Sequence, residues 1–227
     1  MIGEPVAITI RRNVERPSNA VLKAFQGQPT GFVTDAFNGK GCMEYDIKPL
    51  LPTMRFCGTA VTAFCAPMDN LAAMAVLDFA KKGDVIVIGT AGSRTAATIG
   101  DLWAYWAKRI GVVAIVCDGM VRDVEGLLKA GIPVFTRGVT PNSGFKHGPG
   151  EVNTGVTCGG VFIQAGDIVV GDRDGVVAVP RADAPQVAKQ LALVQKKEAE
   201  AERKVKKGEK LKFWDAKALE GRIRYLD

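Results

Sequence analysis

Three short runs of apolar residues in the middle of the chain predict strands that are buried on both faces. They are residues 84–88 (DVIVI), 112–117 (VVAIVC) and 132–136 (IPVFT). The segments between them, 96–110 and 121–130, have the length and composition of helices, the first with an interruption near Gly100. Strands that alternate with helices form parallel sheets with right-handed crossovers. The pattern therefore predicts an α/β fold.

The flanking segments add a helical layer and a second group of strands. Apolar residues at helical spacing predict a helix over 68–82, and a β-rich run predicts a strand over 55–64. Two turn signals within 161–180 separate β-rich runs, which is typical of antiparallel strands. Residues 181–207 predict one long helix. Because no linker or repeat divides the chain, we expect a single domain over residues 1–227, with a core at about 17–180 and a C-terminal helix and tail at 181–227.

The composition is that of an ordinary globular protein, and it argues against a membrane protein. Hydrophobic residues make up 47% of the 227 residues and charged residues 24%. No apolar run reaches the roughly 20 residues that a membrane-spanning helix requires. The first residues do not have the pattern of a secretory signal. We therefore expect a cytoplasmic protein with no membrane partner.

The net charge of +6 raises the question of a nucleic-acid partner. Much of the positive charge lies in residues 196–212, where Lys and Arg alternate with Glu198, Glu200, Glu202 and Glu209. Mixed charges at helical spacing are typical of a solvated helix face. No aromatic residues lie among the basic ones to stack on bases. The sequence therefore predicts no nucleic-acid partner.

The cysteines and the single histidine exclude several kinds of site. An odd number of cysteines without a C-x-x-C pair makes a disulfide framework or a zinc centre improbable. A lone histidine, His147, does not support a metal centre of several histidines. Cys117 precedes Asp118 in a polar region, which is the one hint of a ligand or nucleophile among the cysteines, and we expect it to be a strand residue that faces the core. The five cysteines are Cys42, Cys57, Cys65, Cys117 and Cys158.

Charged residues gather in the loops that follow the predicted strands. Ligands of parallel α/β sheets bind at the carboxyl ends of the strands. An arginine and carboxylates in such a place suggest a hard cation together with an anionic, oxygen-rich substrate. The residues that we expect there are Arg94, Asp101, Asp118, Arg122 and Asp123.

Two alternatives stay open for these loops. The amides at the start of a helix near Gly100 can hold a carboxylate, or Asp101 is simply the N-cap of that helix. Arg122 and Asp123 are either part of a site or a surface pair at a helix start.

Two motifs, residues 100–103 (GDLW) and 118–123 (DGMVRD), carry a resemblance to a known family. The chain resembles the 4-hydroxy-4-methyl-2-oxoglutarate/4-carboxy-4-hydroxy-2-oxoadipate aldolases, a family that also contains the regulators of ribonuclease activity A. Residues 34–36 (TDA), 58–62 (GTAVT) and 165–172 (AGDIVVGD) support it, and it extends over roughly residues 30–208. The resemblance implies an α/β/β/α sandwich of the phosphohistidine-domain type. It also implies homotrimers or homohexamers with sites between subunits.

The resemblance assigns a role to each matching residue. Asp123 would bind Mg²⁺ or Mn²⁺, Asp101 would hold metal-bound water, and Arg122 would contact the keto oxygen of the substrate and the enolate. The substrate-binding residues it implies are Gly100, Asp101, Leu102, Trp103 and Arg122, with the amides of residues 100–103 on the pyruvyl carboxylate.

Some positions carry over less directly from the family. A glutamate on the C-terminal helix of a neighbouring subunit would face the metal-bound waters. Glu198 fits that position best, with Glu200 and Glu202 close by. Trp103 stands where the family has a small or aliphatic residue, which narrows the expected pocket. No role carries over to Lys146 or His147.

Together these implications describe a class II pyruvate aldolase. It would cleave 4-hydroxy-2-oxo acids to pyruvate and a second carbonyl compound, with oxaloacetate decarboxylation as a side activity. One alternative is a non-catalytic binding protein similar to the ribonuclease regulators. Two features argue against this alternative. A regulator has no need of the acidic residues on the C-terminal helix, and a protein of net charge +6 would repel a basic partner. A methyltransferase, or a related lyase or hydrolase acting on another 2-oxo acid, are further alternatives.

Overall fold

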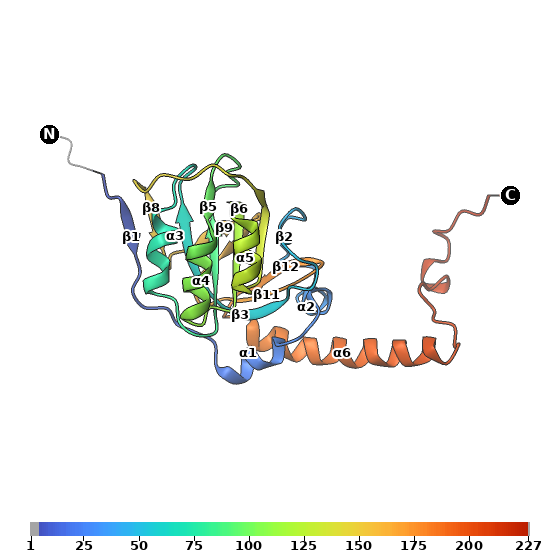
Figure 1. The fold of residues 1–227 in the computed structure, drawn as a ribbon. Coiled ribbons are helices and arrows are strands. Elements are labelled where there is room, and N and C mark those ends of the chain that lie inside the picture. The colour runs from blue at the N-terminus through green and yellow to red at the C-terminus, as the bar shows by residue number, and fades with distance from the viewer. Residues whose placement is uncertain (1–4, 227) are drawn as a thin grey trace.

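A mixed β-sheet runs through the body of the protein, in a computed structural model that describes residues 5–226 (Figure 1). Its centre consists of four parallel strands in the order β3, β4, β6 and β7. Their bounds are Phe56–Cys65, Asp84–Gly89, Ala114–Val121 and Val134–Val139. The predicted parallel α/β arrangement is therefore confirmed.

Shorter strands extend this sheet at both edges. Along its free edge β3 pairs first with β11 and then with β8, both antiparallel, while β1 adds to β8 and β2 adds to β7. The antiparallel pair β11–β12 and the separate hairpin β9–β10 form a second layer. Bounds are β1 Ile8–Ile10, β2 Lys48–Pro49, β8 Gly150–Val152, β9 Val156–Cys158, β10 Val161–Ile163, β11 Ile168–Asp172 and β12 Gly175–Val179.

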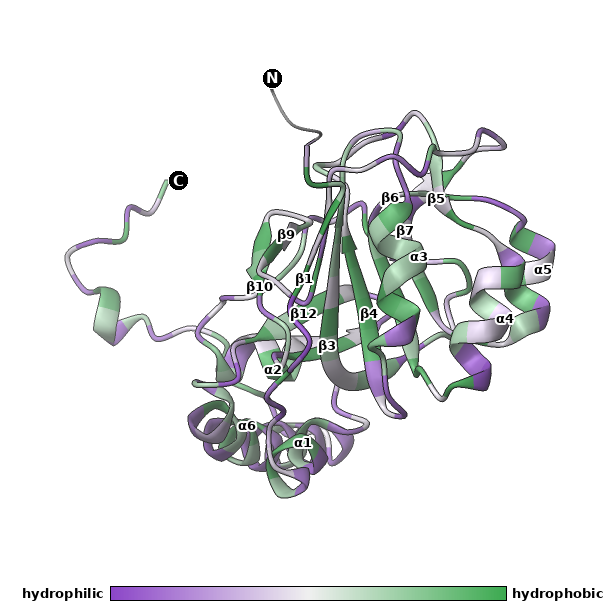
Figure 2. Cartoon of the chain, turned by 90° about the vertical axis from the view of Figure 1, so that its left-hand side faces the viewer, coloured by the Kyte–Doolittle hydropathy of each residue, from purple (hydrophilic) through white to green (hydrophobic). Residues whose placement is uncertain are grey.

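Alternating side chains of the central strands supply two separate cores. On one face, Ile86 and Ile88 pack with the helices α3 (Leu71–Ala75), α4 (Asp101–Arg109) and α5 (Val124–Ala130). On the other face, Val85 and Val87 pack against β9–β12. Figure 2 shows the resulting concentration of hydrophobic residues on β3 and β4. Burial on both faces explains why residues 84–88 read as an uninterrupted apolar run.

A third core anchors the C-terminal helix α6 (Ala184–Lys206). Its first turns pack with α1 (Asn19–Phe25) and α2 (Thr30–Ala36) on the outer side of β11 and β12, and Ala184, Val187 and Leu191 are buried there. The remainder of α6 extends away from the body, followed by the tail with η2 (Lys217–Leu219) (Figure 1). The predicted C-terminal helix is thus confirmed. Over residues 5–226, no helix has the length and apolarity to cross a membrane.

Three predicted helices are shorter than their sequence patterns indicated. The prediction of a helix over 96–110 is wrong at its start, because Ala97–Ile99 forms strand β5 beside β6 and the helix begins at Asp101. The segment 121–130 is helical only from Val124, since Val121 belongs to β6. The segment 68–82 is helical only at Leu71–Ala75 and in the 3-10 turn η1 (Val76–Asp78). At the first two of these ends the chain pairs as strand, and the β-branched residues Thr98, Ile99 and Val121 favour that conformation.

The anchoring of α6 predicts different effects at two leucines that lie two positions apart. Leu191 is 1% exposed and Leu193 is 61% exposed. We expect Leu191→Ala to lower the free energy of unfolding by about 2–5 kcal/mol, because it leaves a cavity in the core. The matched Leu193→Ala change should stay within about 0.5 kcal/mol. Urea unfolding measures both, and equal losses would contradict this account of α6.

Candidate functional site

A cavity of about 400 Å³ opens where β5 gives way to α4, beside the end of β6. Its walls come from four segments that are distant in sequence: the start of α3, the β5–α4 junction, the end of β6, and the loop after β7. The carboxyl ends of β5 and β6 therefore form the floor of the pocket, as expected for a parallel α/β sheet. The predicted residues that line it are Gly100, Asp101, Leu102, Trp103, Arg122 and Asp123.

Arg122 and Asp123 stand together at the end of β6. The amide N–H of Arg122 donates to the Ile99 carbonyl at 3.1 Å, which holds the two strand ends together. The Arg122 Nε lies 3.3 Å from Asp123 Oδ2, and both side chains are partly exposed, at 41% and 45%. Asp123 has a left-handed backbone conformation (φ 58°, ψ 46°), and its carboxylate does not cap α5. Such backbone strain in a non-glycine residue is common at functional sites.

The close approach of α4 to Asp123 depends on Gly100. This glycine takes the N-cap position of α4, so Asp101 lies in the first turn and is not the N-cap. A Cβ atom at Gly100 would lie 2.4 Å from Asp123 Oδ2. A larger residue at this position would push the Asp123 carboxylate away from the start of α4.

Asp101 turns toward two neighbours. Its Oδ1 accepts a hydrogen bond from the Leu102 amide at 2.7 Å, so this amide, expected to be free for a ligand, already has a partner. A substrate carboxylate would have to displace Asp101 to use it. The other carboxylate oxygen faces α5, where a Cβ atom at Gly126 would lie 2.4 Å away. Two glycines thus leave space for two carboxylates.

Leu102 and Trp103, the last two residues of the motif at 100–103, have opposite environments. Leu102 is largely exposed on the surface. Trp103 is buried in the core, where its indole Nε1 donates to the Ala73 carbonyl at 2.8 Å. Because the ring packs between α3 and α4, Trp103 fixes the position of α4 rather than closing the pocket.

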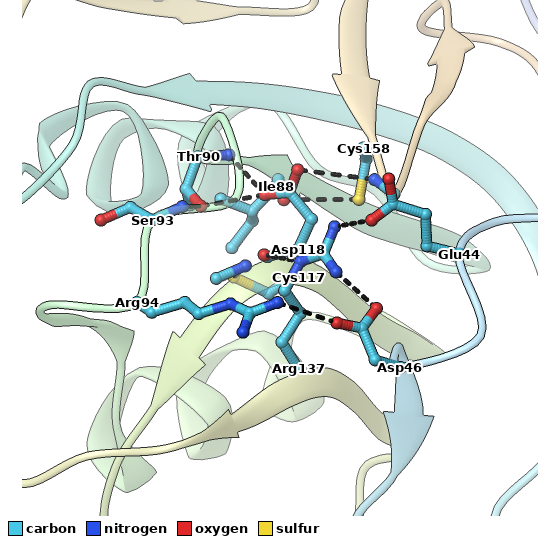
Figure 3. A network of polar contacts seen from close by, with 12 residues as sticks. Glu44, Asp46, Ile88, Thr90, Ser93, Arg94, Cys117, Asp118, Arg137 and Cys158 are labelled. Carbon is cyan, nitrogen blue, oxygen red and sulfur yellow. Dashed lines mark hydrogen bonds and ion pairs between the residues drawn. The ribbon is translucent and has the colours of Figure 1, made fainter.

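Arg94 and Asp118 were expected in the same site, and that expectation is wrong. Asp118 is buried and accepts hydrogen bonds from the Thr90 amide at 2.6 Å and the Thr90 hydroxyl at 2.9 Å (Figure 3). Arg94 pairs with Asp46 at 3.2 Å. Asp118 lies inside β6, where the alternation of side chains turns it away from the pocket.

The centre of this second network is Arg137, a residue that the sequence pattern did not single out. Its Nε donates to the Asp118 carbonyl at 2.6 Å, and its terminal nitrogens pair with Asp46 and Glu44 (Figure 3). The network joins β6 and β7 to the segment before β2, which is a structural role. Its members are distant in sequence, so no local motif could reveal it.

The buried cysteines behave as core residues. Cys117 lies inside β6 and is fully buried, which confirms the prediction of a core-facing strand residue. Burial raises the pKa of Cys65 and Cys117 to about 12, so both thiols stay protonated near neutral pH. In residues 5–226 no three His, Cys, Asp or Glu side chains are grouped so that they could hold a metal ion.

Glu198 does not line the pocket and belongs to the C-terminal half of α6. The outer part of this helix projects from the body (Figure 1). The neighbours of Glu198 on the helix are engaged locally: Glu200 pairs with Lys204 at 2.8 Å, and Glu202 pairs with Lys206. These lysine hydrogen bonds lower the pKa of Glu200 and of Glu202. Glu198 forms no ion pair within the described part of the chain.

Comparison with known proteins identifies a family whose matched region includes this pocket. Residues 30–178 match the family described as Aldolase/RraA. The chain belongs to this family. That span contains all the predicted pocket residues, while the whole of α6 lies beyond it.

Family members with similar sequences or structures carry different names. A Halalkalibacterium halodurans protein named "Putative 4-hydroxy-4-methyl-2-oxoglutarate aldolase" is 37% identical over 80% of this chain and 85% of its own length. An uncharacterised Pseudomonas syringae protein has a TM-score of 0.76 at 25% identity, over 86% of this chain and 96% of that one. The Streptomyces coelicolor protein RraAS2, described as an unusual member of the RNase ES inhibitor RraA family, has a TM-score of 0.73 at 26% identity, over 83% and 98%.

Because Asp101 packs closely against Gly126 in α5, we expect a substitution of this glycine to change the stability of the protein. In an open helix, Gly→Ala stabilises a protein by about 0.5–1 kcal/mol, and we expect this gain at Gly31 in α2, where a Cβ atom meets nothing within 4 Å. Gly126→Ala should instead destabilise the protein by about 1–3 kcal/mol, since Asp101 must move. Chemical unfolding of both variants tests this. A gain at Gly126 equal to that at Gly31 would show that Asp101 is not held there.

Proposed function

We propose that the protein is a divalent-cation-dependent lyase that cleaves 4-hydroxy-2-oxo acids to pyruvate and a second carbonyl compound. The observation that carries the proposal is the pairing of Arg122 with Asp123 at the edge of a pocket that also contains Asp101. A guanidinium group beside two carboxylates suits an anionic substrate bound together with a cation. The name of the relative at 37% identity supports the same reaction class.

The carboxylates of the pocket fit Mg²⁺ or Mn²⁺. These cations prefer oxygen ligands, and Mg²⁺ keeps several waters, so one or two carboxylates suffice. Asp123 would hold the cation, because its carboxylate is partly exposed at the pocket. Asp101, in the first turn of α4, would hold a water molecule bound to that cation. When bound, the cation would withdraw electrons from the keto oxygen of the substrate.

Arg122 would stabilise the charge that develops during cleavage. When the C3–C4 bond breaks, its electron pair moves to C3 and forms the pyruvate enolate, while the 4-hydroxyl loses its proton and becomes a carbonyl. The enolate then takes a proton at C3 and leaves as pyruvate. A guanidinium group paired with Asp123 would donate to the enolate oxygen and stabilise its negative charge. Loss of CO₂ from oxaloacetate gives the same enolate, so we propose that reaction as a side activity.

A second subunit would complete the site in this proposal. Glu198 belongs to the part of α6 that projects from its own body, so it would serve the pocket of a neighbouring subunit in a homotrimer or homohexamer. There it would receive the proton of the 4-hydroxyl. The backbone of residues 100–103 at the start of α4 would hold the pyruvyl carboxylate, once Asp101 has released the Leu102 amide.

The first test is pyruvate release from oxaloacetate with Mg²⁺ or Mn²⁺, followed by EDTA. We expect turnover above the metal-only background, lost on chelation and lost in Asp123→Ala. Asp78→Ala, an exposed aspartate on η1, is the matched control and should retain turnover. If wild-type protein that is folded and oligomeric shows no turnover with either cation, the lyase proposal fails. A binding role, such as the inhibitor function named for the Streptomyces relative, would then replace it.

A second prediction isolates the role of Arg122. Arg122→Ala should lower kcat about 10²–10³-fold, the size of effect seen when one donor that stabilises a developing charge is removed. Arg122→Lys should restore only part of the rate, since a lysine lacks the planar fork of the guanidinium. Steady-state kinetics on oxaloacetate measures both. A rise in KM with kcat unchanged would assign Arg122 to substrate binding alone.

A further inference from the structure

Asn70 is a polar residue whose side chain has no structural task that the fold explains. It occupies the N-cap position of α3, where asparagine normally accepts a hydrogen bond from the helix. Here it makes no such bond, because the neighbouring Asp69 takes the Leu71 amide at 2.8 Å. Asn70 is only 7% exposed, and its Oδ1 has no hydrogen-bond partner within residues 5–226. It lines the same cavity as Arg122 and Asp123.

A buried acceptor without a partner destabilises the folded state, so its retention calls for a reason. At the wall of a ligand cavity, the simplest reason is a donor that arrives with the ligand. A hydroxyl group meets this requirement, because its proton can be donated to Oδ1. The substrates of the proposed lyase carry such a hydroxyl at C4.

Lys146 supplies a positive charge to the same wall. Its loop is firmly attached to the start of α3: the Phe145 amide donates to Met68 O at 2.7 Å, and the Asn70 amide donates to Phe145 O at 2.8 Å. Asp69 Oδ2 accepts from the amides of His147 at 2.6 Å and Gly148 at 2.9 Å.

The backbone on both sides of Lys146 is therefore fixed, while its side chain remains exposed. Lys146 forms no ion pair with any other residue that the structure describes. Asn70 and Lys146 are held in one unit by these bonds, although they lie far apart in the sequence.

We propose that Asn70 and Lys146 form the recognition site for the part of the substrate beyond the pyruvyl unit. Asn70 Oδ1 accepts a hydrogen bond from the 4-hydroxyl group, and the Lys146 ammonium group binds a second carboxylate on the far side of the bond that is cleaved. This inference rests on the proposed lyase function, in which Arg122 and Asp123 hold the pyruvyl end. The cavity has room for both ends, since its 400 Å³ volume is several times what a pyruvyl unit fills.

Lys146 can be tested by binding alone, without any chemistry. The probes are 2-oxoglutarate, which has the second carboxylate but no 4-hydroxyl and so cannot undergo the cleavage, and 2-oxopentanoate, which lacks that carboxylate. In the presence of Mg²⁺, calorimetry should give wild-type protein a Kd at least roughly tenfold lower for 2-oxoglutarate, the size expected of a hydrogen bond to a charged group. Lys146→Met should bring the ratio of the two Kd values close to one, while Lys40→Met, at an exposed lysine outside the pocket, should keep it. An equal ratio in wild type and Lys146→Met would overturn the proposal.

Asn70 is tested with an apolar residue of the same shape. Asn70→Leu should lower kcat/KM for 4-hydroxy-2-oxoglutarate roughly tenfold or more, and it should change inhibition by 2-oxoglutarate much less, because that ligand has no hydroxyl. The melting temperature should stay equal or rise, since an unpaired buried acceptor is removed. A fall of several degrees with equal losses for both ligands would identify Asn70 as structural and overturn its assignment.

The two levels of the proposal fail in different ways. Wild-type protein that prefers 2-oxoglutarate through Lys146 but turns over no 2-oxo acid would refute the lyase function and leave the carboxylate site standing. Wild-type protein that cleaves 4-hydroxy-2-oxo acids, with variants at residues 70 and 146 that keep the same preferences, would refute the recognition site alone.

Discussion

The hydrogen bond from the Arg122 amide to the Ile99 carbonyl ties together the two segments on which the pocket depends. It joins the end of β6 to the end of β5, so the chain enters α4 directly beside Asp123. The contact is so close that a Cβ atom at position 100 would displace the Asp123 carboxylate from its present position. A second glycine, Gly126, admits the carboxylate of Asp101. Without this packing the charged residues would be separate surface groups rather than parts of one site.

The sheet uses its charged residues in two physically different ways. Asp118 and Arg137 are largely enclosed and satisfied by several protein partners, so they stabilise the join between β6, β7 and the segment before β2. Arg122 and Asp123 are each more than one-third exposed and make one contact with each other, which leaves donor and acceptor capacity for a ligand. Burial and saturation of hydrogen bonds thus separate structural charges from those available for chemistry.

The pocket also has two chemically distinct walls. One carries the carboxylates and Arg122, close to the sheet. The other is built by the start of α3 and the loop after β7, which Asp69 holds together through three backbone amides. A buried aspartate that organises a loop in this way is a positioning element, and it costs the protein an unpaired Asn70 beside it. The outer half of α6 takes no part in either wall and projects away from the body (Figure 1).

Local pattern in the sequence determined a large part of this protein. Uninterrupted apolar runs define the buried strands β4, β6 and β7, and the motifs at 100–103 and 118–123 identify residues that do lie at one pocket. Pattern did not place Ala97–Ile99 in a strand, although Thr98 and Ile99 are β-branched, because a run of three residues forms a strand only through its pairing with β6. It also grouped Asp118 with Asp123, since spacing along a chain does not show which face of a strand a side chain occupies once the strand continues to Val121.

Only the tertiary structure shows that Asn70 and Lys146 lie at the same pocket wall. Nothing in the sequence around either residue suggests a partner, because the bonds that bring them together run between backbone groups and Asp69 across a long stretch of chain. Sequence determines which segments bury apolar surface and which carry charge. Only folding decides which polar atoms remain without a partner, since that depends on the neighbours that the completed structure provides.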